Sequence, residues 1–272
     1  MSDSKEVNWI SKLVLFIFTC LFISWTYLQI FNLGDFSLQN QLFSAVYGLV
    51  ALCGGIFGLR IAQKWGGFKS IIGRSISFLS LGLLAQVFGQ ITYSSYTFFL
   101  KIEIPYPSFG DFGYFGSIIF YTIGLLYLAK ASGLTFRLQN FKAKIIAIVI
   151  PVIILLFSYL IFLKGYQFDW NNPLKIFLDF GYPLGDSIYI SIALLIYFMS
   201  KGILGGLMKS KVLFLLFALL IQFFADFSFL YISYYGEMHP AGINDLIYLL
   251  AYYFMTIALV EMLTVYHEIK NL

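Results

Sequence analysis

Hydrophobic residues along this chain fall into eight long runs separated by short polar connections. Each run has about the length of 20 mostly apolar residues that an α-helix needs to cross a bilayer. The runs are continuous, whereas a membrane β-strand alternates apolar and polar positions over about ten residues. The pattern therefore predicts eight transmembrane helices, over residues 9–30, 41–62, 71–97, 111–131, 144–163, 175–200, 211–234 and 244–267.

Composition favours lipid as the surroundings of the whole chain. Of its 272 residues, 60% are hydrophobic and only 11% are charged, and the mean hydropathy is +0.87. A soluble domain carries about 25% charged residues, so this chain has too little polar surface to cover a water-soluble fold. No connection is long enough to hold a soluble domain, and we expect residues 1–272 to form a single all-α polytopic membrane domain.

Lysine and arginine predict the orientation, because positive residues accumulate in cytoplasmic loops. With the N-terminus inside, the turns alternate between poor and rich in positive charge, and both termini are cytoplasmic. Of the 17 basic residues, three then lie outside, namely Lys101, Lys164 and Lys175. The other 14 lie inside: Lys5, Lys12, Arg60, Lys64, Lys69, Arg74, Lys130, Arg137, Lys142, Lys144, Lys201, Lys209, Lys211 and Lys270. We therefore expect a multi-pass protein of the plasma or inner membrane.

An Asp-x-x-Tyr pattern recurs near the outer ends of three predicted spans, at residues 111–114, 186–189 and 245–248. Two copies have a longer match, Tyr-Pro-Ser-Phe-Gly-Asp at 106–111 and Tyr-Pro-Leu-Gly-Asp at 182–186. The repetition suggests tandem helical hairpins of the same orientation. An aspartate at a helix start also caps free backbone N–H groups and meets the positive end of the helix dipole. Asp111 and Asp245 can therefore be explained as caps alone.

Two further aspartates lie deeper. Asp186 and Asp226 are each 15 residues from a lysine at the predicted inner boundary. That separation places both about 22 Å above this boundary, inside a hydrocarbon core about 30 Å thick. Charged groups at this depth are costly, and they usually face the bundle interior or a water-filled cavity. Gln86 and Gln90 share a helix face, and Gln222 and Asp226 have the same spacing of four.

We predict an outward-facing polar pocket among these groups. A carboxylate without a neighbouring cation takes up a proton, accepts several hydrogen bonds, or binds a cationic ligand. The alternative is an interhelical hydrogen-bond network that only holds the helices together. The candidate ligand-binding residues are Asp186, Asp226, Asp111, Asp245, Gln90, Gln86, Gln222, Tyr182 and Tyr189.

Other chemistry has little support in the sequence. Cys20 and Cys53 form no C-x-x-C pair, and His239 and His267 belong to opposite faces of the predicted bundle. These residues predict no metal site and no haem. The basic residues are spread over short connections rather than gathered on one face, so we expect no nucleic-acid partner. We expect no cofactor either.

The order of the acidic motifs resembles a known family. The motifs are Pro-Tyr-Pro-Ser-x-Gly-Asp-x-x-Tyr at 105–114, Tyr-Pro-Leu-Gly-Asp at 182–186, Ala-Asp-x-x-x-x-Tyr at 225–231 and Asn-Asp-Leu-Ile-Tyr-Leu-Leu-Ala-Tyr at 244–252. This order resembles the multi-helix membrane sensor region that precedes GGDEF-type diguanylate cyclase, EAL-type phosphodiesterase and some histidine kinase domains in prokaryotes. The resemblance covers roughly residues 80–265 and implies a sensory input module with Asp111, Asp186, Asp226 and Asp245 as its signature acids. No output domain follows here, so signalling would pass to a separate cytoplasmic partner.

These features favour a stand-alone sensory or receptor-like module that binds a small ligand at the outer face, and not an enzyme. An ion-coupled transporter or channel is the alternative, because intramembrane acids and a break of the sixth span at Pro183 would suit it. Against transport, Glu261 is the only carboxylate of the inner half. The third reading is an intramembrane aspartyl protease in which Asp186 and Asp226 share a proton. Pro183 replaces the first glycine of the Gly-x-Gly-Asp motif that this reading needs.

Overall fold

The computed structural model describes residues 3–31, 34, 36–133, 141–199, 206–236 and 238–270. Within these ranges all regular structure is helical, and eight segments are long and apolar enough to cross a membrane. The predicted all-helical fold with eight spans is confirmed, and the chain is a multi-pass membrane protein. Arg137, Lys201 and the last position of the predicted span 175–200 lie outside the described residues.

The helices follow the predicted spans closely at most of their ends. They are α1 (Asp3–Phe31), α2 (Leu38–Val46), α3 (Leu49–Lys64), the short η1 (Gly67–Lys69), α4 (Ile71–Ser95) with its π-helical extension η2 (Tyr96–Leu100), α5 (Gly110–Ala131), α7 (Phe141–Ser158) with its π-helical extension η3 (Tyr159–Leu163), α8 (Pro173–Met199), α9 (Gly206–Tyr235) and α10 (Ile243–Lys270).

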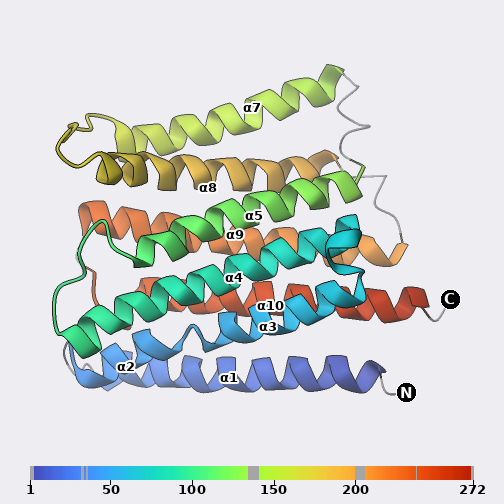
Figure 1. Cartoon of the computed structure of the whole chain (residues 1–272), viewed down its shortest axis with the longest axis horizontal. Helices are drawn as coiled ribbons and strands as arrows, with labels where there is room; N and C mark the ends of the chain where they lie inside the picture. The colour runs from blue at the N-terminus through green and yellow to red at the C-terminus, as the bar shows by residue number, and fades with distance from the viewer. Residues whose placement is uncertain are drawn as a thin grey trace.

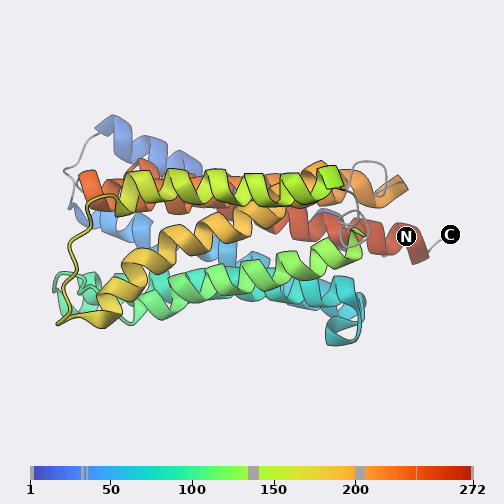
Figure 2. The ribbon, with the colours of Figure 1, turned by 90° about the horizontal axis from the view of Figure 1, so that it is seen from above.

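All the long helices run along the long axis of the molecule, with α1 and α7 at opposite edges of the bundle (Figure 1). Both chain termini lie at one end, here called the terminal end, and the view from above agrees (Figure 2). The opposite, distal end holds residues 34 and 36–37 and the connections 101–109, 164–172 and 238–242. Helix α10 is the most buried span, and it packs against α9, α3 and α1.

Consecutive helices pack as antiparallel neighbours, among them α3 with α4, α4 with α5, α7 with α8, and α9 with α10. The described lysines and arginines predicted to be cytoplasmic belong to the terminal end, whereas Lys101, Lys164 and Lys175 belong to the distal end. Two ion pairs, Lys64 with Glu6 and Lys211 with Glu261, also lie toward the terminal end, each at 2.5 Å. The cytoplasmic location of this end stays a prediction from charge.

The second span, predicted over 41–62, is confirmed as a crossing over Leu38–Lys64, but it is interrupted near its distal end. Helix α2 ends at Val46 and α3 begins at Leu49, with a turn at Tyr47 and Gly48 between them. Backbone groups that leave a helix inside lipid need other partners within the protein. The partner here comes from α4, as described below.

The sixth span, in contrast to the second, is one uninterrupted helix. Pro183 was expected to break it, but α8 runs without interruption from Pro173 to Met199. The Ser187 hydroxyl donates to the Pro183 carbonyl at 2.6 Å, one turn further along the helix. This bond is to the carbonyl of Pro183 itself, whereas the carbonyl that a proline leaves without its helical donor is the one four residues earlier. Membrane helices tolerate proline where other groups of the protein meet that need.

Glycines set the close approach of α4 and α5. A Cβ atom on Gly113 would lie 2.5 Å from both the Ala85 carbonyl oxygen and the Gly89 backbone nitrogen. A Cβ atom on Gly82 would lie 2.3 Å from the Tyr121 ring. Small residues allow helix backbones to approach closely in membranes, where van der Waals contact drives association. This contact fixes the rotation of α5 and therefore the direction of its polar side chains.

We predict that Gly113→Ala destabilises the protein, because the new methyl group meets backbone atoms that cannot move aside without separating the helices. Overpacking of this kind costs about 1–3 kcal/mol. Gly116→Ala on the same helix is the matched control, since a Cβ atom there meets nothing within 4 Å. Thermal unfolding of the two purified variants in detergent measures the difference. Equal midpoints would contradict this account of the α4–α5 contact.

Candidate functional site

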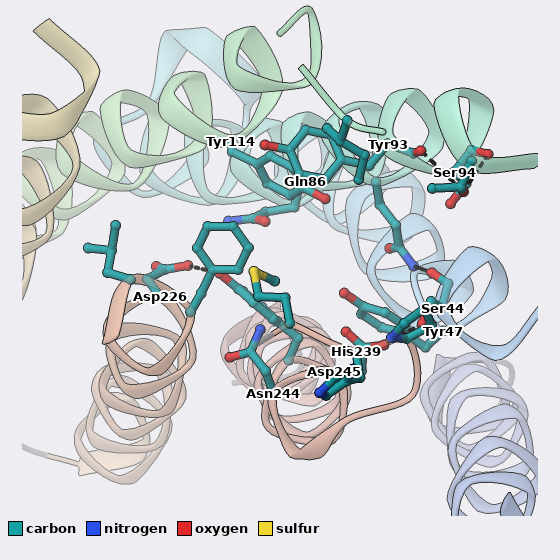
Figure 3. Close-up of a pocket in the computed structure, with 18 of the residues that line it drawn as sticks. Ser44, Tyr47, Gln86, Tyr93, Ser94, Tyr114, Asp226, His239, Asn244 and Asp245 are labelled. Atoms are coloured by element: carbon teal, nitrogen blue, oxygen red, sulfur yellow. Dashed lines mark hydrogen bonds between the residues drawn. The ribbon is translucent and has the colours of Figure 1, made fainter. Parts of the chain in front are cut away.

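A cavity of about 210 Å³ lies among the distal halves of the helices (Figure 3). Its walls come from α2, α4, α5, α8, α9 and α10, and residues 36, 104 and 238–240 of the distal connections complete its lining. Its lining residues belong to the distal connections and the neighbouring parts of these helices, so the cavity lies toward the end of the bundle opposite the termini. Of the nine predicted site residues, six line it: Asp186, Asp226, Asp245, Gln86, Gln90 and Tyr182.

Asp226 on α9 is held by three neutral donors. The Tyr248 hydroxyl donates to Oδ1 at 2.9 Å, and the Gln222 side-chain amide donates to the same oxygen at 3.0 Å. The Tyr189 hydroxyl donates to Oδ2 at 3.1 Å. The donors come from α10, α9 and α8, so one carboxylate joins three spans. Gln222 and Tyr189 do not line the cavity themselves; both are fully buried behind Asp226.

Gln86 and Gln90 both face the cavity, as their spacing on one helix face predicted. The Gln86 amide nitrogen donates to the Ser117 hydroxyl at 2.8 Å, and its carbonyl oxygen accepts from the Tyr252 hydroxyl at 3.1 Å. Gln86 thus connects α4 with α5 and α10. These bonds fit the interhelical network, while the same side chain also forms part of the wall.

Asp186 on α8 lacks such partners. Its side chain is only 1% exposed and lines the cavity. Within the described part of the chain, neither carboxylate oxygen has a hydrogen-bond partner. Leaving a buried polar group unpaired costs about 1–3 kcal/mol, and more when it is charged. A carboxylate kept at this cost inside a membrane bundle is typical of a functional group.

Asp245 is both a cap and part of the wall. It lies in the first turn of α10, where its Oδ2 accepts from the Ala241 backbone N–H at 2.9 Å and from the Ser44 hydroxyl at 2.5 Å. Ala241 has a φ of 58°, which is uncommon for a residue other than glycine. Trp25 and Gln29 of α1 both donate to its carbonyl at 2.9 Å. These bonds tie α1 and α2 to the start of α10.

Asp111 lies outside the cavity lining, contrary to the predicted pocket. It sits in the first turn of α5, where its Oδ2 accepts from the Ser108 backbone N–H at 2.6 Å and the Ser108 hydroxyl at 3.0 Å. Its Oδ1 accepts from the Tyr182 hydroxyl of α8 at 2.7 Å. The contacts of Asp111 at the start of α5 therefore agree with the expected capping role. Its bond from Tyr182 also links α5 to α8.

The break in the second span is part of the site. The Gln90 side-chain amide donates to the Ser44 backbone carbonyl at 2.6 Å, in the last turn of α2. Gly48 leaves the space for it, because a Cβ atom there would lie 2.0 Å from the Gln90 amide oxygen. The opened turn brings Ser44 and Tyr47 to the cavity wall (Figure 3). Interrupted membrane helices commonly line binding cavities in this way.

Several wall residues were missed from the sequence, namely Ser44, Tyr47, Tyr114, Asn244 and Tyr248. Two of them could have been predicted from the sequence, because Tyr114 and Tyr248 are the tyrosines of two Asp-x-x-Tyr copies. Asn244 accepts from the Ser228 hydroxyl at 2.6 Å and neighbours Asp245 in sequence. Ser44 and Tyr47 belong to none of the recurring motifs, and the turn after α2 was not predicted.

A second aspartate of α8 anchors the distal connections. Asp179 accepts from the Tyr106 hydroxyl at 2.7 Å and from the Tyr166 hydroxyl at 2.6 Å. Burial raises the pKa of Tyr106, and burial with the Asp179 bond raises the pKa of Tyr166 to about 12. Both phenols therefore remain protonated donors at neutral pH. The connections 101–109 and 164–172 are thus fixed to the outer part of α8.

Below the cavity, toward the terminal end, large apolar side chains predominate, with the small buried hydroxyls of Ser80 and Thr256 among them. Leu83, Leu125, Leu219, Met255 and Leu259 are all completely buried there. They come from α4, α5, α9 and α10. On each of these helices they lie three or more residues closer to the terminal end than the last residue that lines the cavity. The polar cavity is therefore closed on this side by a packed apolar layer.

The cavity wall carries three acidic side chains and one histidine, His239. No lysine or arginine occurs among its described lining residues. No group of three or more His, Cys, Asp or Glu residues suited to a metal ion occurs within the described ranges. The arrangement can therefore present carboxylate oxygens, neutral donors and aromatic rings to a small molecule.

Comparison of the chain with family models, curated proteins and solved structures gives no significant match. The functional assignment therefore depends on the geometry of this cavity and on the chemistry of its walls.

We predict opposite stability effects for two aspartates of the wall. Asp226→Leu leaves three buried donors unsatisfied, each at a cost of about 1–3 kcal/mol, and should lower the unfolding midpoint strongly. Asp186→Leu removes no hydrogen bond and replaces a buried carboxyl group with an apolar one, so its midpoint should stay equal or rise. Thermal unfolding in detergent measures both. A similar loss in the two variants would assign Asp186 to the helix-holding network instead.

Proposed function

We propose that this chain is a receptor-like sensory module of the plasma or inner membrane, which binds a small ligand in the distal cavity. One observation carries the proposal: the buried Asp186 carboxyl group lines the cavity without a partner among the described residues. The other three acids named in the sequence are satisfied by donors of the protein. The network that holds the helices together therefore does not include this fourth carboxyl group.

The proposal places the distal end outside the cell. Support comes from the lysines and arginines, which concentrate toward the terminal end as cytoplasmic loops require. A cavity at the distal end would then receive molecules from the external medium. The motifs also resemble membrane sensor regions of cyclic-di-GMP enzymes and histidine kinases. That resemblance agrees with a ligand bound from outside and a signal passed to a cytoplasmic partner.

The packed layer beneath the cavity favours reception over passage. Leu83, Leu219 and Met255 are completely buried between the cavity and the terminal half. Glu261, a carboxylate of that half, forms an ion pair with Lys211. These contacts leave the intramembrane acids on one side of an apolar barrier. A receptor needs only this one-sided access.

Ion-coupled transport is the second candidate, and the interruption between α2 and α3 favours it. Transporters commonly bind substrates at discontinuous helices near the middle of the membrane. In this protein the interrupted backbone is already satisfied by Gln90 and borders the same cavity. Transport would also require the cavity to open toward the terminal end at some stage, which gives an experiment that separates the two functions.

We predict that a cysteine in the cavity reacts with a charged, membrane-impermeant methanethiosulfonate reagent from the outer side only. Ser94→Cys is suited to this because Ser94 lines the cavity and differs from cysteine by one atom. The variant is made in a protein carrying Cys20→Ala and Cys53→Ala, which removes the native thiols. Modification is measured in intact cells and in inside-out vesicles by mass spectrometry of the purified protein.

Glu268→Cys, exposed in the last turn of α10, is the matched control for sidedness and should react in inside-out vesicles only. Reaction of Ser94→Cys from both sides would favour transport over reception. No reaction from the outer side, with Glu268→Cys behaving as expected, would refute an outward-facing ligand cavity.

A further inference from the structure

We infer that the cavity binds a small organic cation, with its ammonium group against the Asp186 carboxylate and its carbon atoms against the surrounding aromatic rings. The inference rests on the proposed function, since it assumes that the cavity is a ligand site open to the outside. It specifies the chemical class of ligand, which that proposal leaves undefined.

The charge balance of the wall is the first argument. Three carboxyl groups line the cavity, those of Asp186, Asp226 and Asp245, and no lysine or arginine lies among the described lining residues. Asp226 has three neutral donors, and Asp245 has two. Of these three carboxyl groups, that of Asp186 is the one without a hydrogen-bond donor among the described residues. A positive group supplied by a ligand would meet it, and a negative ligand would be repelled by all three.

Aromatic rings are the second argument. The Phe229 ring lies 6.5 Å, centroid to centroid, from the rings of both Tyr114 and Tyr248, and Tyr93 meets Tyr114 edge-on at 4.9 Å. All four line the cavity. The Tyr248 hydroxyl is already bound to Asp226. Rings gathered in this way next to a carboxylate suit an alkylammonium group, which is attracted to the π-electron face.

The alternatives fit the wall less well. A metal ion generally takes several oxygen, nitrogen or sulfur ligands from the protein, and no such group of three occurs in the described part of the molecule. Protonation of Asp186 would remove its charge but would still leave a polar group unpaired in a cavity with room for a molecule. An ammonium ion needs only one carboxylate and the aromatic faces already present.

The size of the cavity limits the ligand. Its volume of about 210 Å³ is somewhat larger than the engineered cavity of roughly 150 Å³ that holds a benzene molecule. It is smaller than the ~300–1,000 Å³ typical of sites for drug-sized molecules. The ligand should therefore be a small amine or quaternary ammonium compound with one short carbon skeleton.

Such an ammonium group can come from a soluble amine or from the headgroup of an ethanolamine or choline lipid. Residues of the distal connections, Ile104, Met238 and Pro240, complete the cavity lining. Both sources would reach the cavity past these connections, so the shared chemistry is the ammonium group. The experiment separates the two sources by changing the lipid.

The test uses Ser94→Cys in the protein without native cysteines, reconstituted in phosphatidylglycerol vesicles, which lack ammonium headgroups. The rates of modification by a cationic and an anionic methanethiosulfonate reagent are compared first. The acidic wall should favour the cationic reagent by roughly tenfold or more, as charged clefts do for oppositely charged molecules. Asp186→Asn should reduce this ratio clearly, whereas Glu103→Gln, the same change of charge at an exposed distal position, should not.

Protection by ligands is measured next, with two matched pairs of probes. Choline is compared with its uncharged analogue in which carbon replaces nitrogen, and butylamine is compared with butanol. At least one amine should slow modification while its neutral partner does not, and Asp186→Asn should abolish the protection. Adding phosphatidylethanolamine to the vesicles tests the lipid source: protection by the lipid without protection by free amines assigns the ammonium group to a headgroup.

Equal effects of each amine and its neutral partner, with no protection by ethanolamine lipid, would overturn the inference. So would protection that persists fully in Asp186→Asn. If this variant does not fold, the paired probes on the Asp186 protein still decide the question. In these outcomes Ser94→Cys still reacts from the outer side, so the receptor proposal survives; a Ser94→Cys thiol that does not react from that side would refute both.

Discussion

Polar groups inside a membrane bundle must find their partners within the protein, because lipid offers none. In the distal half of this bundle, aspartates meet part of that need by accepting from hydroxyl and amide donors. Asp226 binds two tyrosines and a glutamine, Asp179 binds two tyrosines, and Asp111 binds Tyr182. Neutral donors satisfy a carboxylate without the cost of burying a second charge. The placement of α5, α8, α9 and α10 relative to one another depends on these bonds.

The same constraint gives Asp186 its significance. The Tyr189 and Tyr248 bonds to Asp226 and the Tyr182 bond to Asp111 join different helices, so those two acids have a structural reason to be present. Asp186 joins nothing in the described chain and occupies a helix whose other acid, Asp179, is fully paired. Stability alone would favour an apolar residue at this position. Its presence next to a hollow, and not within a packed contact, is the reason to regard the distal cavity as a site.

Hydropathy predicted the eight spans well, because the requirement for about 20 apolar residues depends on sequence alone. Helical spacing placed Gln86, Gln90, Asp186 and Asp226 at a common depth, and all four line the cavity. The depth of a residue in the membrane does not define the rotation of its helix. The sequence therefore could not predict that Asp111 points to Ser108 at the start of α5, while the other three signature acids line the cavity. Rotation is decided by packing contacts such as that of Gly113 with the α4 backbone. The break at Tyr47 and Gly48 depends on Gln90, which is distant in sequence.

The helices that carry the two deep aspartates offer a route by which binding in the cavity would affect the terminal end. Asp186 and Asp226 belong to α8 and α9, and both helices continue beyond the cavity toward the terminal end. A cation drawn to Asp186 would change the balance of forces between α8 and its neighbours, because Asp186 is the acid of the cavity wall that has no hydrogen-bond partner among the described residues. The apolar layer below is closely packed, and packed interiors transmit strain with little compression. Under the proposed function, a small displacement of α8 against α9 would therefore reach the terminal end as a movement of whole helices.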